Sequence, residues 1–165
     1  MERDNVTKIK TKNEKLSRFI EFSLGSEEYA IPLLMVREVI SVPETTPIPK
    51  SPAHFLGIMN LRGQIISVID LRKKLKIEIR EKLDETVIIV NVGGVYIGVV
   101  VDSINRVIGF SADEVSDVPE ISNQINTQFI LGVYRKENSL TVLLDIAKVL
   151  DLSDMEAIGG NKKSA

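Results

Sequence analysis

Short apolar runs alternate with polar residues along most of the chain and end at glycine or asparagine, a pattern that predicts β-strands joined by tight turns. Residues 18–31 and 86–99 each contain two such runs on either side of a glycine-containing turn. Residues 57–69 and 132–144 each contain two apolar runs separated by a polar segment. We therefore expect a mainly β protein built from hairpins, with few helices.

The chain repeats itself at a fixed offset of 75 residues. Self-similarity of this kind is typical of a duplicated unit, so we expect two similar halves that meet near residues 76–85. Chance similarity between β-rich segments is the alternative. At this offset Gly57 matches Gly132, Asp70 matches Asp145 and Leu75 matches Leu150. A weaker echo at a different spacing pairs residues 18–31 with 86–99, with one residue of slippage, and Met35–Ile40 with Ile104–Ile108.

Helices are predicted at few places, each marked by a capping residue. Asp70 and Asp145 follow apolar strands and precede short basic segments, so we expect their carboxylates to accept backbone N–H hydrogen bonds at two helix starts. Ser51 followed by Pro52 predicts a further short helix over residues 51–55. The Ser-x-x-Glu capping box occurs twice, at Ser111 with Glu114 and at Ser153 with Glu156.

The composition fits one ordinary domain or two small fused ones without disulfides. The chain has 165 residues, 44% hydrophobic and 5% aromatic, with no Cys and a net charge of −2. A core with few rings is filled by Ile, Val and Leu, which favours strands. The apolar window 87–101 is shorter than the roughly 18 residues of a spanning helix and is interrupted by Gly93-Gly94, so we expect a hairpin there and a cytoplasmic protein.

No motif points to catalysis or to metal binding. The only histidine is His54, and no Cys is present to join it as a ligand. The carboxylate pairs Glu27/Glu28 and Asp113/Glu114 lie where turns or helix starts are expected. We expect no enzyme activity, no cofactor and no metal site.

Binding of single-stranded nucleic acid is the alternative function, because small β-barrels often serve this purpose. Such proteins combine exposed rings with a positive groove. Here Phe19, Phe22 and Tyr96 occupy alternating strand positions where burial is expected, and the net charge is negative. Both features disfavour the alternative.

Arg62 is the residue that the strand pattern explains least. It precedes Gly63 at a predicted turn, where glycine permits the backbone conformation. Two interpretations stay open from the residues alone: an ordinary solvated cation, or a side chain that projects toward a partner.

The stretch GIMNLRGQIISVIDLRKKL from Gly57 resembles the signature of the CheW family of bacterial chemotaxis coupling proteins. Residues 27–40, 99–108 and 129–150 also agree with that family. The resemblance implies a mainly β fold of two similar small five-stranded β-barrels, SH3- or OB-like, packed together. It also implies a few short helices and a C-terminal helix.

We expect the chain to divide into three parts. From composition we expect residues 1–17 to be a disordered basic leader and residues 153–165 to be a C-terminal helix with a loose tail, while the resemblance implies a CheW-like domain over residues 18–152. The approximate halves of the domain are 18–80 and 81–152. Families of this type can exchange strands between halves, so the cut near residue 80 need not be a structural boundary.

The resemblance implies a non-catalytic adaptor that joins the cytoplasmic tips of methyl-accepting chemoreceptors to the CheA histidine kinase. The regulatory domain of CheA is similar to CheW, so the two can alternate in rings beneath a receptor array, and self-association within such rings is a further implication. Neither nucleic-acid binding nor direct membrane insertion is implied.

Two sets of contact residues follow from the resemblance. The charged candidates in both sets resist burial unless they are paired, whereas the aliphatic candidates could equally belong to the core. Receptor binding is implied for Leu33, Val36, Glu38 and Arg62, and contact with the kinase or a ring neighbour for Ile104, Val107, Glu120 and Ile121.

Overall fold

The computed structural model of the protein describes residues 16–79, 85–118 and 127–150. Several predictions lie outside these ranges: the leader up to residue 15, the capping box at Ser153, the C-terminal helix, and the candidates Glu120 and Ile121. Within the described ranges, no helix is long and apolar enough to cross a membrane.

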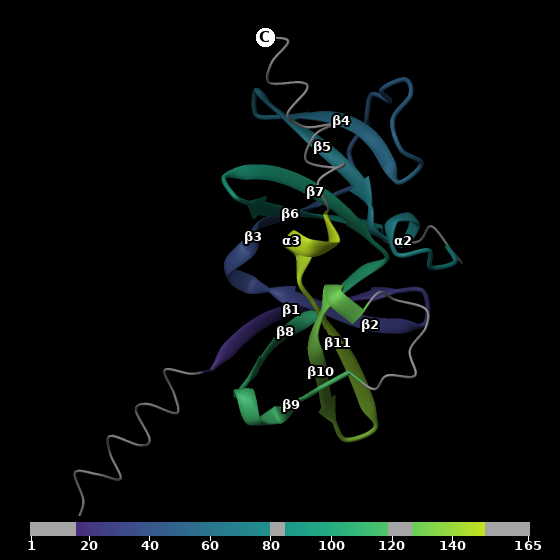
Figure 1. Cartoon of the computed structure of the whole chain (residues 1–165). Helices are drawn as coiled ribbons and strands as arrows, with labels where there is room; N and C mark the ends of the chain where they lie inside the picture. Colours follow the sequence, from purple (N-terminus) through teal and green to yellow (C-terminus); the bar gives the residue numbers. More distant parts are fainter. Residues whose placement is uncertain (1–15, 80–84, 119–126, 151–165) are drawn as a thin grey trace, which may run out of the picture.

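The described chain is mainly β and forms two packed sheets (Figure 1). One sheet has the strand order β8-β1-β2-β11-β10-β9, and the other has the order β3-β6-β7-β5-β4. We call them barrel A and barrel B. The strands are β1 (Ser17–Leu24), β2 (Glu27–Pro32), β3 (Val36–Ser41), β4 (Phe55–Leu61), β5 (Gln64–Asp70), β6 (Thr86–Val92), β7 (Val95–Val101), β8 (Ser103–Phe110), β9 (Val115–Ser116), β10 (Ile130–Lys136) and β11 (Ser139–Leu144).

Each sheet contains strands from both sides of residue 80. The β1–β2 hairpin pairs with β8 and β11, whereas the β6–β7 hairpin pairs with β3 and β5. Leaving out the short β9, the two sheets have equivalent orders when β1 is matched with β6, β2 with β7, β3 with β8, β4 with β10 and β5 with β11. The two halves thus exchange their first hairpins, and the repeat in the sequence corresponds to a repeat in structure.

Barrel B is closed by the segment that follows β3. Thr46 pairs with Ile58 of β4 through two backbone hydrogen bonds of 2.8 and 3.0 Å. This segment passes directly over Gly57, where an added Cβ would collide with the Thr46 carbonyl. Gly57 also has a φ of 141°, which favours glycine, and it lies at a register shift between β4 and β5. The first glycine of the repeat is therefore required for closure.

Barrel A is also closed by a segment that passes over a glycine. After β8 the chain returns as β9, where Val115 pairs with Tyr134 and Ser116 with Val133 of β10. A Cβ at Gly132 would collide with the Val115 side chain and approach the Ser116 carbonyl. Gly132 also lies at a register shift, between β10 and β11. The match of Gly57 with Gly132 thus reflects a shared steric requirement.

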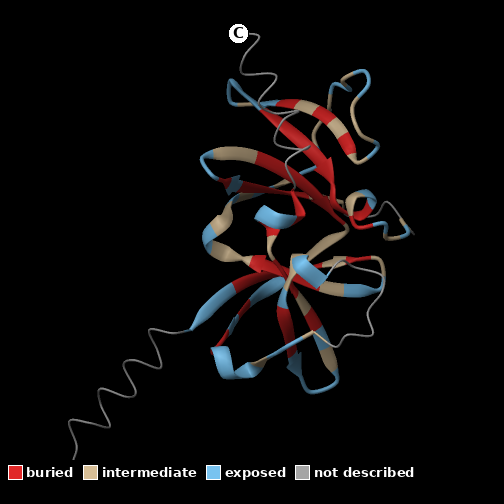
Figure 2. Ribbon diagram, viewed as in Figure 1, coloured by how far each residue is buried: buried red, intermediate tan, exposed pale blue. Residues whose placement is uncertain are grey.

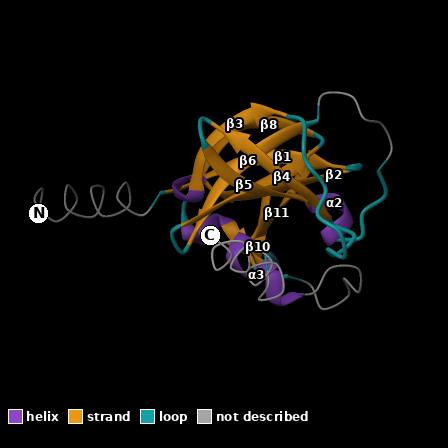
Figure 3. Cartoon of the chain, turned by 90° about the horizontal axis from the view of Figure 1, so that it is seen from above, coloured by secondary structure: helices purple, strands orange, loops and turns teal. Residues whose placement is uncertain are grey.

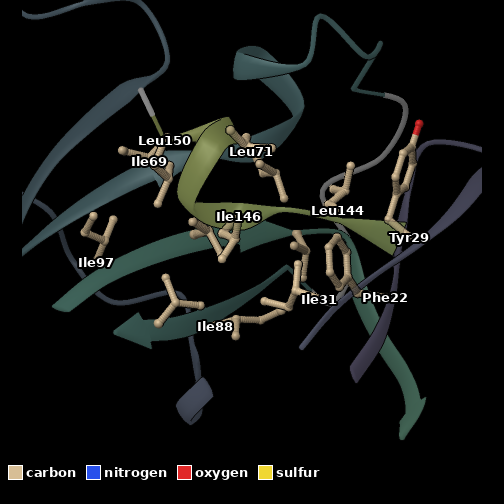
Figure 4. Packing of buried hydrophobic residues seen from close by; sticks show 14 of the residues in the cluster. Phe22, Tyr29, Ile31, Ile69, Leu71, Ile88, Ile97, Leu144, Ile146 and Leu150 are labelled. Carbon is tan, nitrogen blue, oxygen red and sulfur yellow. The ribbon is translucent and has the colours of Figure 1, made fainter. Parts of the chain in front are cut away.

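The largest buried cluster lies between the barrels rather than inside either of them (Figures 2 and 4). It joins Phe22 and Ile31 of the exchanged hairpin in barrel A to Ile88 and Ile97 of barrel B. Smaller clusters fill each barrel. Because apolar burial is the main source of stability, the interface makes the two barrels a single folded unit.

Two short helices contribute to this interface: α2 (Leu71–Lys74), which follows β5, and α3 (Ile146–Val149), which follows β11 (Figures 1 and 3). Both predicted caps are confirmed. Asp70 accepts a hydrogen bond from Arg72 N at 3.0 Å, and Asp145 accepts one from Lys148 N at 3.3 Å. Both helices place apolar side chains in the inter-barrel cluster: Leu71 from α2, and Ile146 and Val149 from α3.

The helix predicted over residues 51–55 is wrong. Residues 53–54 form a turn, and strand β4 begins at Phe55. The Ser51 hydroxyl donates to the Ile48 carbonyl at 2.7 Å instead of capping a helix. Phe55 pairs with Ile69 and is buried between the barrels, and this packing outweighs a one-turn helix, which is marginal in isolation.

The capping box predicted at Ser111 is present, around the 3₁₀ turn η2 (Ala112–Glu114). The Glu114 carboxylate accepts hydrogen bonds from the Ser111 backbone N–H at 3.4 Å and from its hydroxyl at 3.0 Å. The motif therefore caps a single turn between β8 and β9 rather than a longer helix.

Candidate functional site

Glu38 of β3 and Arg62 of the β4–β5 turn form an ion pair at the surface of barrel B. Arg62 donates through Nη1 to Glu38 Oε1 at 3.1 Å and through Nη2 to Oε2 at 2.9 Å. The Arg62 side chain is 71% exposed and that of Glu38 is 22% exposed. The structure thus pairs two residues that the resemblance indicated as receptor contacts. The bidentate geometry fixes the plane of an accessible guanidinium.

The turn that carries Arg62 has an unusual backbone. Arg62 and Gly63 both have positive φ, at 52° and 83°, and Asn60 Oδ1 accepts a hydrogen bond from Gly63 N at 2.9 Å. Residues 91–94 of the β6–β7 hairpin make the same asparagine bond at 2.9 Å, but Gly93 takes the place of Arg62. Arg62 therefore adopts a backbone conformation that glycine reaches without strain, as do Lys50, Lys76 and Glu137.

A bulge in β3 places a second arginine beside this pair. Val36 pairs with Val90 and Glu38 pairs with Ile89, which leaves Arg37 as the extra residue of the bulge. The exposed Arg37 guanidinium lies over the ring of Tyr96, a residue of β7, at 4.2 Å from the ring centroid. The sequence pattern did not indicate this residue.

Arg37 has one further contact, a hydrogen bond from Nη1 to Gln64 Oε1 at 3.3 Å. We call Arg37, Glu38, Arg62, Gln64 and Tyr96 the arginine cluster. Its three formal charges, two positive and one negative, leave the cluster with one unit of positive charge. The cluster is therefore suited to a partner with a carboxylate.

The other receptor candidates lie next to this cluster in the chain and are largely structural. Leu33, in the 3₁₀ turn η1 (Leu33–Met35), and Val36 are half-buried and pack against the inter-barrel cluster. Leu34 between them is fully exposed, at 101% of its reference area. Leu34 was not among the predicted contacts, although four consecutive apolar residues after Pro32 cannot all face the core.

The two described kinase or ring candidates differ in exposure. Both lie on β8, at one edge of the barrel A sheet. Ile104 packs against the inter-barrel cluster, while Val107 is 54% exposed. Val107 is thus free to contact a partner, and Ile104 mainly supports the fold.

Barrel A has its own version of the paired charges. A register shift between Glu21 and Phe22 leaves Asn105 of β8 as the extra residue, at the place equivalent to Arg37. Arg106, equivalent to Glu38, donates from Nε to Glu21 Oε1 at 3.1 Å. Here the carboxylate is buried, with 2% of its side chain exposed. The charge pair of barrel A is therefore more internal than that of barrel B.

A buried charge network ties α2 to the two barrels, and its centre is Arg72, with 2% of its side chain exposed. Arg72 bonds Asp70 through Nε and Nη2, each at 3.0 Å, and Asp102 through Nη1 at 2.7 Å. A third carboxylate, Glu85, accepts from Nη2 at 3.0 Å. Asp102 also accepts from Gly25 N in the β1–β2 turn, so the network links the exchanged hairpin to barrel B.

This network determines the state of the Arg72 side chain. Burial by itself lowers the pKa of the guanidinium, but hydrogen bonds from Arg72 to Asp70, Asp102 and Glu85 outweigh that effect and leave the pKa above its ordinary value. The arginine in the Asp-Leu-Arg segment is therefore a structural residue. The sequence could not show this, because two of its partners lie 13 and 30 residues away.

Among the described residues, Tyr29 also has a shifted pKa. Its ring lies in the inter-barrel cluster while the hydroxyl points away from it (Figure 4). Burial, with a smaller contribution from the charge of Glu27, raises the pKa of Tyr29 to about 12.

In the described part of the chain, no group of three or more His, Asp or Glu side chains is placed to hold a metal ion. Phe19 and Phe22 are buried, and the Tyr96 ring carries the Arg37 guanidinium, so these three rings do not form the stacking surface that single strands require.

Comparison with known proteins gives a consistent result. The sequence matches the CheW-like domain family over residues 18–154. It is 34% identical to the chemotaxis protein CheW of Treponema pallidum over 151 residues, which cover 88% of this chain and 89% of that one. It is 33% identical to the Klebsiella aerogenes CheW over 147 residues, with the same coverage. The crystal structure of the scaffolding protein TtCheW from Thermoanaerobacter tengcongensis superposes with a TM-score of 0.76 at 31% identity, covering 84% of this chain and 90% of that chain.

Proposed function

Because the chain belongs to the CheW family, we propose that it is a non-catalytic chemotaxis adaptor that couples the cytoplasmic tips of chemoreceptors to the CheA histidine kinase. A scaffold role in chemotaxis follows from the family. The finer proposal concerns the partners, the cytoplasmic location at receptor arrays, and the surfaces used.

The exposed Glu38–Arg62 pair is the observation that supports this proposal most. A receptor tip is a helical hairpin, and such helices dock through an apolar face flanked by charges. Barrel B offers both elements: the fully exposed Leu34, between the half-buried candidates Leu33 and Val36, and the accessible ion pair. An exposed ion pair contributes little to stability, so its geometry is better explained by recognition.

We assign contact with the kinase or a neighbouring ring member to the other barrel, barrel A. Val107 on the edge strand β8 of barrel A supplies an exposed apolar side chain. Ile104 supports it from the inter-barrel cluster, and Glu120 and Ile121 complete the set from a region outside the described residues. Partners on two different barrels would allow one adaptor to hold receptor and kinase together.

Co-sedimentation tests this proposal. The purified chain is mixed with a receptor cytoplasmic fragment, with CheA, or with both, and each mixture is centrifuged with the receptor fragment assembled on vesicles. We expect the chain in the pellet with receptor alone and more CheA in the pellet when the chain is present. A chain that stays in the supernatant in all mixtures would contradict the proposal.

A further inference from the structure

We propose that Arg37 binds an acidic side chain of the docked receptor tip and so acts as a second determinant of partner choice beside Arg62. This inference rests on the proposed function and adds a residue to it. The bulge in β3 leaves Arg37 without a paired residue on β6, and the Arg37 side chain lies over the Tyr96 ring.

The contacts of Arg37 leave most of its donors available. A guanidinium has five N–H donors in one plane. Stacking on Tyr96 uses the face of that plane, and the bond to Gln64 uses one donor at Nη1. The remaining edge is free to bind a carboxylate with two parallel hydrogen bonds. Because the ring already orients the side chain, less conformational entropy is lost on binding.

The charge balance favours an acidic ligand. Arg62 is matched by Glu38, whereas within the described residues Arg37 has only a neutral amide and a ring as partners. The equivalent bulge residue in barrel A, Asn105, bonds to Ser23 at 3.0 Å within its own barrel. Of the bulges in β3 and β8, only that in β3 presents a charged side chain that has no oppositely charged partner among the described residues.

The occupant is therefore a helix of the receptor tip that carries Asp or Glu beside its apolar face. Nucleic acid is the competing source of negative charge, but it would need an accessible ring, and the Tyr96 ring is covered by Arg37 itself. The acidic side chain would bind at Arg37 while apolar residues meet Leu34, three residues away and fully exposed.

Binding affinities of charge-removal variants test the inference. Dissociation constants for a fluorescent receptor cytoplasmic fragment are measured at several salt concentrations with the wild-type chain, Arg37→Gln and Arg37→Glu. We expect at least about tenfold weaker binding for Arg37→Gln, because the charge-assisted hydrogen bonds to the carboxylate are lost, a larger loss for Arg37→Glu, and a shallower salt dependence for both. Arg135→Gln removes an equal charge from an exposed position on barrel A and should bind as the wild type does.

Two further measurements separate the possible outcomes. Each exposed acidic residue of the receptor fragment is changed to its amide, and one change should weaken binding to the wild type about tenfold but leave binding to Arg37→Gln unaltered. Tyr96→Phe keeps the ring and should retain affinity. The inference fails, while the proposed function stands, if the wild type binds the fragment and Arg37→Gln binds it equally well. It fails in the same way if Arg135→Gln weakens binding as much as Arg37→Gln does. If the wild type does not bind the fragment, both fail.

Discussion

Gly57 and Gly132 lie 75 residues apart, and each sits where the strand segment that closes its barrel leaves no room for a Cβ. At Gly57 the obstacle is the Thr46 backbone, and at Gly132 it is mainly the Val115 side chain. Both copies of the repeat thus have glycine at this position because a side chain would not fit. Its equivalence across the two barrels explains why the repeat is clearest around these positions.

The first prediction concerns these glycines. Gly57→Ala should reduce the free energy of unfolding by about 3 kcal/mol or more, because the clash is with backbone and φ is 141°. Gly132→Ala should cost about 1–3 kcal/mol, because a side chain can shift. Urea denaturation followed by circular dichroism measures both. Gly109→Ala, with its nearest atom at 4.0 Å, is the control and should change little.

The second prediction compares two aspartates at equivalent positions. Asp145 only caps α3, so Asp145→Ala should cost about 0.5–2 kcal/mol. Asp70 caps α2 and also pairs with the buried Arg72, so Asp70→Ala should cost about 3–5 kcal/mol. Denaturant unfolding of the two variants under identical conditions provides the comparison. Equal losses would show that the Arg72 network contributes nothing beyond the cap.

The third prediction separates recognition from stability at Arg62. Glycine relieves the positive φ of 52° and removes the side chain, so Arg62→Gly should leave the free energy of unfolding unchanged or raise it by up to about 1 kcal/mol. Binding to a receptor fragment should nevertheless fall at least tenfold, because the ion pair with Glu38 is lost. Parallel unfolding and binding measurements decide this. A variant that unfolds more easily and loses binding in proportion would make Arg62 a structural residue.

The fourth prediction concerns stability at high pH. Tyr29 has a pKa of about 12 in the folded protein and about 10 when unfolded, so the folded state disfavours its ionisation. Its contribution is fully present below pH 10 and is lost as the pH rises from 10 to 12. Over that interval the wild type should lose more free energy of unfolding than Tyr29→Phe does. Parallel curves for the two proteins would contradict the raised pKa.

Much of the fold could be predicted from the sequence, because the relevant signals are local. Alternating apolar residues and turn glycines gave the hairpins, and the aspartates gave both helix starts. The exchange of hairpins between barrels could not be predicted from the residues, because the pairing of β2 with β11 depends on long-range packing. The helix predicted at Ser51 failed for the same reason, since the burial of Phe55 in a strand outweighed the local signal.

The candidate site was predicted in part. Resemblance indicated Glu38 and Arg62, and the structure adds that they pair with each other. Arg37 and Leu34 were missed. The direction of Arg37 depends on a bulge that only strand pairing reveals, and the full exposure of Leu34 depends on the 3₁₀ turn that turns its side chain outward.

The central claim is that this chain makes kinase activity depend on receptors through the barrel B surface. Autophosphorylation of CheA, measured with vesicle-assembled receptor fragments fixed in either signalling state, tests it most directly. We expect the CheA rate to differ between the two receptor states when the wild-type chain is present, and not when the chain is omitted or replaced by Arg62→Gly. A rate that is the same in both receptor states with the wild-type chain, or a full response with Arg62→Gly, would contradict the account.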